Sequence, residues 1–206
     1  MKNIATLIFT SIVLVGCVNP INQNTAVNYY NEGERELQRG NLPVAKEMFS
    51  RSLVNARLGG ASPSDEAKIQ LKLARINGNL CLHNDAEKLF IEAIKNLEKD
   101  NSGPGYTFIP RVEFAQYLFD IGKYDKAISR YKVIISEAKP LFGEKDPMSI
   151  VLLYDDLVYA YEQIGDKNNA AMVRQESQKI EKNNKGFTTP KIIKSRENYK
   201  PYPKSC

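Results

Sequence analysis

The stretch GNLPVAKEMFSRSL, residues 40–53, decides the fold because similar phrases return three times along the chain. They are CLHNDAEKLFIEAI at 81–94, GKYDKAISRYKVII at 122–135 and GDKNNAAMVRQESQ at 165–178. Each phrase has an alanine at its sixth position, and successive alanines are 41, 41 and 43 residues apart: Ala45, Ala86, Ala127 and Ala170. Self-similarity at a period of about 20–50 residues is typical of repeat architectures. The sequence therefore predicts four repeats.

Two more positions in each repeat keep a fixed spacing from the alanine. Four residues later come mostly aromatic side chains: Phe49, Phe90, Tyr131 and Arg174. Twelve residues earlier come mostly small ones: Gly33, Ala74, Ala115 and Val158. This pattern resembles the tetratricopeptide (TPR) repeat, and LFGEKDPMSIVLLYDDLVYAYEQIGDKNNA at 141–170 is most similar to the longer, kinesin-light-chain-like type. The resemblance implies an all-α fold, a right-handed α-solenoid of about four TPR-like helix pairs over residues 26–182.

Local signals agree with eight helices, expected at 27–39 with 42–57, 63–79 with 83–99, 110–121 with 124–140, and 147–164 with 167–182. Ser62-Pro63 and Asp146-Pro147 each offer an N-cap followed by proline at the first helical position. In three repeats a glycine stands where the first helix must end and turn, a position at which a positive φ favours glycine. In the second repeat this position is Cys81. We therefore expect that turn to be distorted or shifted in register.

The N-terminus has the pattern of a signal peptide over residues 1–16. Lys2 is followed by the apolar run IATLIFTSIVLV at 4–15, which is shorter than the roughly 20 residues of a membrane span. Leu14-Val15-Gly16-Cys17 resembles a bacterial lipobox, which implies cleavage before Cys17 and a lipid-modified thiol bearing acyl chains such as palmitate; an ordinary secreted protein is the alternative. By the same resemblance Val18 favours the periplasmic face of the outer membrane. Residues 17–25 would be the lipidated cysteine and a polar tether.

The positive charge of the chain is concentrated at its C-terminal end. The net charge is +5, yet residues 18–178 carry 20 basic against 22 acidic side chains, and 179–206 carry 8 against 2. From 183 to 206 no helical period persists, and we expect a flexible basic tail. The alternative is a segment that binds an acidic partner, anionic lipid or cell-wall polymer, whereas the signal peptide argues against nucleic acid. Its basic and aromatic residues are Lys191, Lys194, Arg196, Tyr199, Lys200, Tyr202 and Lys204.

Motifs of catalysis and metal binding are missing from the sequence. It contains no G-x-x-x-x-G-K-[ST], H-E-x-x-H, G-x-S-x-G or G-x-G-x-x-G. Cys81 and His83 lie close together, but a zinc site needs three or four ligands and no others cluster nearby. We expect His83 to pack in the core, and we expect no enzymatic activity, cofactor or metal.

Once Cys17 is lipidated, two cysteines remain, in an oxidising compartment. A bridge between Cys81 and Cys206 would tie the tail to the second repeat. A free or intermolecular thiol is equally compatible with the sequence.

The TPR resemblance also implies a binding surface, because the first helix of each pair lines a concave groove that takes up a peptide or a partner helix. Carried over from the aligned alanines, the lining positions are Tyr30, Glu34, Gln38, Lys68, Arg75, Asn79, Gln116, Asp120, Asp155, Tyr159, Glu162 and Gln163. The sequence thus predicts a non-enzymatic envelope lipoprotein that binds other envelope proteins as an adaptor or assembly factor. Analogy favours pilus or secretion-system assembly. The alternatives are a regulator of peptidoglycan synthases or hydrolases, or a wall-binding tether that uses the basic tail.

Overall fold

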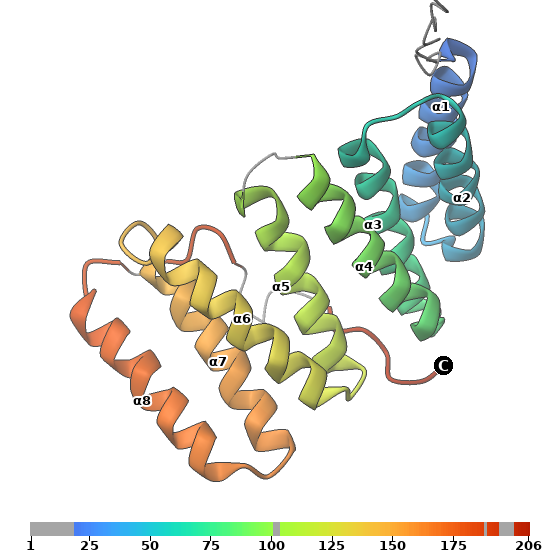
Figure 1. Ribbon diagram of the computed structural model, residues 1–206. Coiled ribbons are helices and arrows are strands. Elements are labelled where there is room, and N and C mark those ends of the chain that lie inside the picture. The colour runs from blue at the N-terminus through green and yellow to red at the C-terminus, as the bar shows by residue number, and fades with distance from the viewer. Residues whose placement is uncertain (1–18, 101–103, 188, 194–199) are drawn as a thin grey trace, which may run out of the picture.

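The computed structural model describes residues 19–100, 104–187, 189–193 and 200–206, and within them the chain forms eight helices. Consecutive helices pack as antiparallel pairs, and the pairs follow one another along a solenoid (Figure 1). The predicted all-α fold of four TPR-like pairs is confirmed. The helices are α1 (Pro20–Gln38), α2 (Leu42–Leu58), α3 (Pro63–Asn79), α4 (His83–Lys99), α5 (Pro104–Asp120), α6 (Tyr124–Phe142), α7 (Pro147–Gln163) and α8 (Lys167–Asn183).

The repeated small and aromatic residues form the contacts inside each pair. The four aligned alanines are at most 3% exposed, and the aromatic side chains of the first three repeats are fully buried. In the first repeat, a β-carbon on Gly33 would stand 2.8 Å from the ring of Phe49, a distance that real side chains do not adopt. A glycine is therefore needed where the ring of α2 crosses the backbone of α1. This close crossing explains the small residues twelve positions before each alanine.

Two helices begin earlier than the sequence suggested. Asn19 caps α1 by accepting hydrogen bonds from the N–H groups of Ile21 and Asn22, and Pro20 is the first helical residue. Residues 20–25, expected to be part of a tether, are thus the first turns of α1, because Asn-Pro is itself a helix-start signal. Similarly, α5 starts at Pro104, and Pro110 lies inside the helix instead of beginning it.

The turn at Cys81 differs from the prediction. Cys81 has a φ of 57°, close to the 76°, 82° and 76° of Gly40, Gly122 and Gly165. Its N–H donates to the carbonyl of Gly78 at 3.1 Å, and the N–H of Gly122 makes the corresponding bond at 3.0 Å. The turn is therefore neither distorted nor shifted. A cysteine adopts the left-handed conformation instead, at a steric cost of roughly 1–2 kcal/mol relative to glycine.

Candidate functional site

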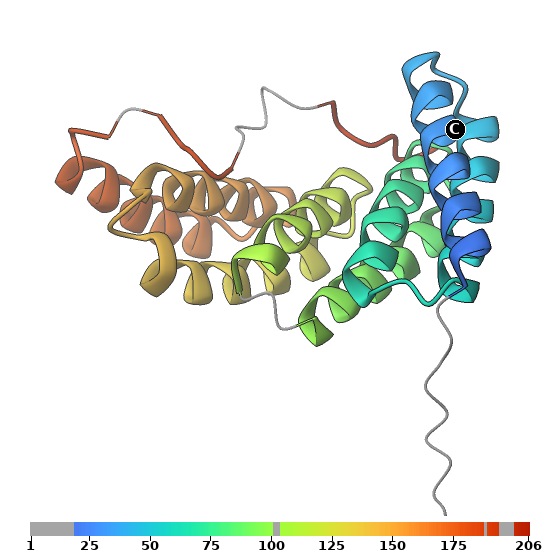
Figure 2. The ribbon, with the colours of Figure 1, turned by 90° about the horizontal axis from the view of Figure 1, so that it is seen from above.

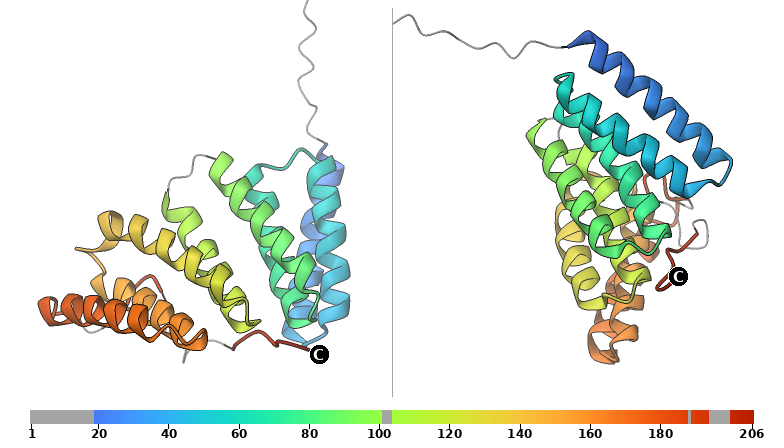
Figure 3. Two further views of the ribbon diagram at one scale, coloured as in Figure 1. Left: turned by 60° about the horizontal axis from the view of Figure 1, so that its bottom comes forward. Right: turned by 90° about the vertical axis from the view of Figure 1, so that its right-hand side faces the viewer.

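The C-terminal segment, defined here as residues 189–193 and 200–206, lies along the first helices of the repeats. After α8 the chain passes α7 and α5 and reaches the end of α3, on the side of α5 and α3 away from α6 and α4 (Figures 2 and 3). The expectation of a flexible tail is wrong for these residues. The physical reason is that their backbone N–H groups bond to side chains of the helices and that Ile192, Ile193 and Tyr202 pack against the hydrophobic core.

The upstream part of the segment is held by two side chains at the start of α7. Asp146 Oδ2 accepts hydrogen bonds from the backbone N–H groups of Lys191 at 3.0 Å and Ile192 at 2.9 Å. Ser149 Oγ accepts from Ile192 at 3.2 Å and from Ile193 at 3.1 Å. Burial favours the protonated form of Asp146, but the hydrogen bonds that Ser149 and the N–H groups of Lys191 and Ile192 donate to it outweigh burial and hold its pKa below the ordinary value. Asp146 and Ser149 bind backbone groups and do not themselves select a side chain, whereas the side chain of Ile193 is buried in the core.

The downstream part is held by the ring of Tyr202. It packs edge-on against Tyr117, with centroids 5.0 Å apart and an angle of 85° between the planes. A β-carbon on Gly78 would stand 2.8 Å from Tyr202 Cδ1, so the ring lies directly on the backbone of α3. Burial raises the pKa of the Tyr202 phenol, which keeps the hydroxyl neutral. Gly78 and Tyr117 thus form a pocket shaped for an aromatic ring, called here the tyrosine pocket.

The surroundings of the tyrosine pocket also provide hydrogen-bond acceptors for the N–H and hydroxyl groups of Tyr202. Its N–H donates to Asp120 Oδ2 at 3.1 Å, and its hydroxyl donates to Glu113 Oε1 at 3.2 Å. Glu113 is held in turn by Arg75 through two hydrogen bonds of 2.6 Å, which raise the pKa of the guanidinium. Charge-assisted, two-pronged pairs of this kind fix geometry as well as charge. The carboxylate that receives the tyrosine hydroxyl is therefore pre-positioned.

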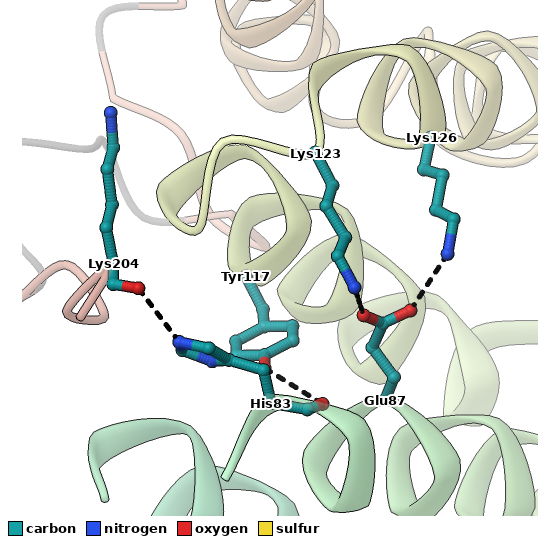
Figure 4. Close-up of polar contacts among 6 residues, drawn as sticks. All are labelled: His83, Glu87, Tyr117, Lys123, Lys126 and Lys204. Carbon is teal, nitrogen blue, oxygen red and sulfur yellow. Dashed lines mark hydrogen bonds and ion pairs between the residues drawn. The ribbon is translucent and has the colours of Figure 1, made fainter. Parts of the chain in front are cut away.

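His83 joins the segment to the solenoid next to this pocket (Figure 4). Its Nε2 is 3.1 Å from the carbonyl oxygen of Lys204, and its Nδ1 is 3.0 Å from the hydroxyl of Tyr117. Because a carbonyl only accepts, Nε2 carries a proton in its contact with Lys204, and the Tyr117 hydroxyl also donates to the backbone carbonyl of His83 at 3.3 Å. The ammonium of Lys204 donates to Tyr124 Oη at 3.1 Å. His83, expected in the core, is half-buried and links two parts of the chain.

Glu87 fixes the junction of the second and third repeats beside this site. Its carboxylate forms ion pairs with Lys123 and with Lys126, the latter at 3.1 Å (Figure 4). Burial alone would raise the pKa of Glu87, but the two ammonium groups outweigh it and hold the pKa below the usual value. The pairs tie α4 to α6 and thereby help to hold the repeats that carry the two sides of the tyrosine pocket.

A disulfide between Cys81 and Cys206 closes the end of the segment onto the second repeat. The two Cα atoms are 5.9 Å apart and the sequence separation is 125 residues. The sequence left this bridge open, and the structure contains it. It also explains why a cysteine stands in a turn where the other repeats have glycine. Cys206 is exposed and Cys81 is half-buried.

Four of the predicted groove residues gather around the segment: Arg75, Asn79, Gln116 and Asp120. Arg75 and Gln116 line a cleft of about 410 Å³ whose other wall includes Lys200 and Tyr202. Asn79 lies at the last turn of α3, beside Gly78. Apart from Lys68, the predicted lining of the second and third repeats is thus the surface that the C-terminal segment covers.

The predicted residues of the first repeat, and Lys68 of the second, lie elsewhere. Tyr30 and Lys68 line a separate cleft of about 450 Å³ between α1, α2 and α3. Glu34 forms an ion pair with Lys72 at 2.8 Å, and Gln38 is exposed at the end of α1. This end of the groove is open.

In the fourth repeat two of the predicted residues face α8 and two face solvent. Asp155 accepts a hydrogen bond from Ser177 at 3.0 Å and Glu162 pairs with Arg174, so both face α8. Burial raises the pKa of Asp155. Tyr159, which is 49% exposed, and Gln163 face solvent.

The predicted tail residues are placed only in part. Lys191 and Lys200 are exposed, and Tyr202 and Lys204 make the contacts described above. Lys194, Arg196 and Tyr199 lie outside the described residues, as does the lipidation candidate Cys17.

Sequence reasoning missed five residues that hold the segment: Gly78, Glu113, Tyr117, Asp146 and Ser149. One signal was present, since Gly78 is a glycine inside a predicted helix and such a residue indicates a close approach of another group. Within the part of the chain that the structure covers, no three or more His, Cys, Asp or Glu side chains gather as metal ligands would. None of the described helices combines the length and apolar character needed to cross a bilayer.

The solved structures most relevant to this chain are TPR-like. It resembles BtubC (BKLC) from P. vanneervenii with a TM-score of 0.66 at 18% identity, over 82% of this chain and 68% of the other. It resembles a putative kinesin light chain of Podosopora anserina with nearly identical TPR-like repeats at a TM-score of 0.66 and 14% identity, over 84% and 81%. It also resembles MamA, with a TM-score of 0.56 at 20% identity, over 80% of this chain and 82% of the other. No model of a known protein family matches the sequence, and no curated protein does either. The likeness concerns the fold, and it agrees with the predicted kinesin-light-chain-like repeat type.

Proposed function

We propose that this TPR-like solenoid is a non-enzymatic adaptor that binds another protein as an extended segment on the face formed by α3, α5 and α7. One observation carries the proposal: that face already holds an extended peptide, the chain's own C-terminal segment. TPR-like scaffolds serve protein–protein interaction, and the first helices provide the expected surface.

The contacts divide into a general and a selective part, as in other modes of peptide recognition. Asp146 and Ser149 bind backbone N–H groups, which every residue except proline offers. The tyrosine pocket selects a side chain by its ring and hydroxyl. A surface with both parts binds a defined class of segments without needing a catalytic group.

We further propose that the adaptor is anchored in the bacterial envelope through a lipid on Cys17, on the periplasmic face of the outer membrane. The supports are the run of residues 4–17 and the disulfide, since such bonds persist in exported proteins and are rare in the cytosol. Replacing Cys17 with Ser should abolish labelling by radioactive palmitate and shift the protein from membrane to soluble fractions. Unchanged labelling and fractionation would exclude the anchor.

Within the envelope we favour an assembly factor for pili or secretion systems, by analogy of fold alone. Loss of the gene should then abolish pili or secretion. A regulator of peptidoglycan synthases or hydrolases would instead alter cell shape or cause lysis. A wall tether that uses the basic tail is the other alternative: it would bind purified sacculi through exposed tail charges such as Lys191 and Lys200, and salt would reverse that binding.

Photo-crosslinking in cells tests the adaptor function. Probes are placed at Lys68 and Tyr159, which are exposed on α3 and α7, and a control probe is placed at Val54, which is 56% exposed on the second helix α2. The proposal predicts one dominant protein trapped from the first-helix probes and none from Val54. A partner trapped from Val54 alone would place the binding surface on the other face.

A further inference from the structure

We propose that the C-terminal segment occupies the site at which the partner binds, and that the partner inserts a tyrosine into the same tyrosine pocket. The Cys81–Cys206 disulfide holds the segment in place, so the partner is excluded until this disulfide is reduced. This inference rests on the adaptor function proposed above and deepens it by naming the class of segment that binds. The kind of partner segment is inferred from the chain's own sequence at this site, Lys-Pro-Tyr-Pro-Lys at 200–204.

The first step of the argument is that the tyrosine pocket is a built recognition site. Gly78 leaves room for a ring on the backbone of α3, and Tyr117 supplies an edge-on partner. Glu113 receives the hydroxyl, which favours tyrosine over phenylalanine, since a ring without the hydroxyl would lose this hydrogen bond to a carboxylate. Tyr124 receives a basic side chain two residues later. A fitting partner therefore presents tyrosine followed two residues later by lysine or arginine in an extended segment.

The second step is that non-covalent contacts hold this part of the segment only loosely. Of residues 200–206, Tyr202 and Pro203 are partly buried and the other five are exposed. One ring and a few bonds at the surface resemble a bound peptide more than a core element. Segments with few buried apolar contacts open most readily.

The third step is that the disulfide makes the contact exclusive. A partner in solution competes with a non-covalent occupant, but it does not displace one that is covalently closed on both sides of the pocket. After reduction, the segment remains tethered through α8 at an effective concentration on the order of millimolar. A partner with higher affinity then gains access, while weak binders are still excluded.

The fourth step is that the bond is chemically accessible. Cys206 is exposed at the chain end, and Cys81 is half-buried in a surface turn. A dithiol reductant attacks one sulfur as its thiolate, which breaks the Cys81–Cys206 bond and forms a mixed disulfide. Its second thiol then displaces the mixed disulfide, so that the reductant leaves as a cyclic disulfide. Two electrons and two protons pass to the protein, and both cysteines become thiols.

A peptide titration tests the inference. The probe is a fluorescein-labelled peptide with the sequence of residues 200–206 and serine in place of the cysteine, and binding is measured by fluorescence anisotropy. Three full chains are compared, each with Cys17→Ser: the oxidised protein, Cys206→Ser, and Cys206→Ser with Tyr202→Ala, which leaves the pocket without its own ring. We expect no binding to the oxidised protein, weak binding to Cys206→Ser and at least tenfold tighter binding to the double variant. Wild-type protein reduced with dithiothreitol should behave like Cys206→Ser, which guards against a folding defect of the variant.

Two controls define the site. A peptide with alanine at the tyrosine position should lose binding to the double variant, and so should the wild-type peptide when Gly78→Ala is added to that protein. Failure of the peptide to bind the double variant, or equal binding to the oxidised protein, would overturn the inference. If the peptide fails while the Tyr159 probe still traps a partner in cells, the adaptor function stands and only this inference falls. If the peptide binds as expected while no partner is trapped from any first-helix probe, the pocket is real and the adaptor function is wrong.

Discussion

The ring of Tyr202 occupies the space that a side chain at position 78 would need, because a β-carbon on Gly78 would stand 2.8 Å from Tyr202 Cδ1. A glycine inside a helix is unfavourable by roughly 0.5–1 kcal/mol relative to alanine. Here the glycine leaves room for the ring of a residue 124 positions later in the sequence. The segment that carries this ring is bound covalently to Cys81 through Cys206. The end of the chain and the second repeat thus have complementary shapes at this contact.

Gly78→Ala should release the end of the segment. The added methyl group also stands 2.9 Å from Tyr117, so the gain in helix propensity of about 1 kcal/mol is outweighed by overpacking of about 1–3 kcal/mol. We expect a lower melting temperature and faster hydrogen exchange at residues 202–206. Gly105→Ala on α5 is the matched control, because a β-carbon there meets nothing within 4 Å. The same response in both variants would refute the packing of Tyr202 on α3.

Removal of the disulfide should destabilise the solenoid. In the chain-entropy description a native disulfide contributes about 2–4 kcal/mol, and more for long loops such as this one. We expect Cys206→Ser to lower the free energy of unfolding in urea by about that amount under non-reducing conditions. Under reducing conditions the wild type and the variant should unfold alike. Equal stability of the two proteins without reductant would show that the bond does not constrain the chain.

The upstream contact should be lost in acid. The pKa of Asp146 is lower in the folded protein than in the unfolded chain, so its stabilising contribution is present above the unfolded value and is lost as the pH falls through the folded value. Protection of the amides of Lys191 and Ile192 against hydrogen exchange, corrected for the intrinsic rate, should decline over that range, because both donate to Asp146. Asp146→Asn should reduce their protection at neutral pH by roughly tenfold, because charge-assisted hydrogen bonds are the stronger ones.

Asparagine caps helices as well as aspartate does, so this substitution leaves the start of α7 intact. Asp166→Asn is the control, since Asp166 caps α8 through Asn169. Protection at 191 and 192 that does not change in Asp146→Asn would contradict the contact.

The small-residue positions can be tested in the first repeat. A β-carbon on Gly33 would meet three atoms of the Phe49 ring at 2.8–2.9 Å. Gly33→Ala should therefore destabilise the protein by about 1–3 kcal/mol despite the better helix propensity of alanine. Combining it with Phe49→Leu should recover part of the loss in urea unfolding. A stabilised single variant would mean that α1 and α2 are not this close.

The repeat architecture could be predicted because its signals are local and periodic. Ala45 and its three equivalents mark every helix crossing, and the glycines mark the turns between paired helices. The starts of α1 and α5 differ from the predictions because each helix begins at an earlier proline, Pro20 in α1 and Pro104 in α5.

The occupied groove could be predicted only in part. Arg75, Asn79, Gln116 and Asp120 follow from the alignment of the repeats, since equivalent positions of first helices share one face. The docking of Tyr202 does not follow from it, because no local pattern relates a residue near the chain end to a glycine in α3. The two cysteines were the only long-range signal, and a sequence does not give the distance between them.

Non-reducing peptide mapping of protein purified from its native host tests the account most directly, because the occupied groove depends on the latch between Cys81 and Cys206. Trypsin cleaves after Arg75, Lys88 and Lys204, so the account predicts a linked pair of peptides 76–88 and 205–206 from monomeric protein, which separates on reduction. Free thiols at both positions, or the pair found only in disulfide-linked dimers, would contradict it.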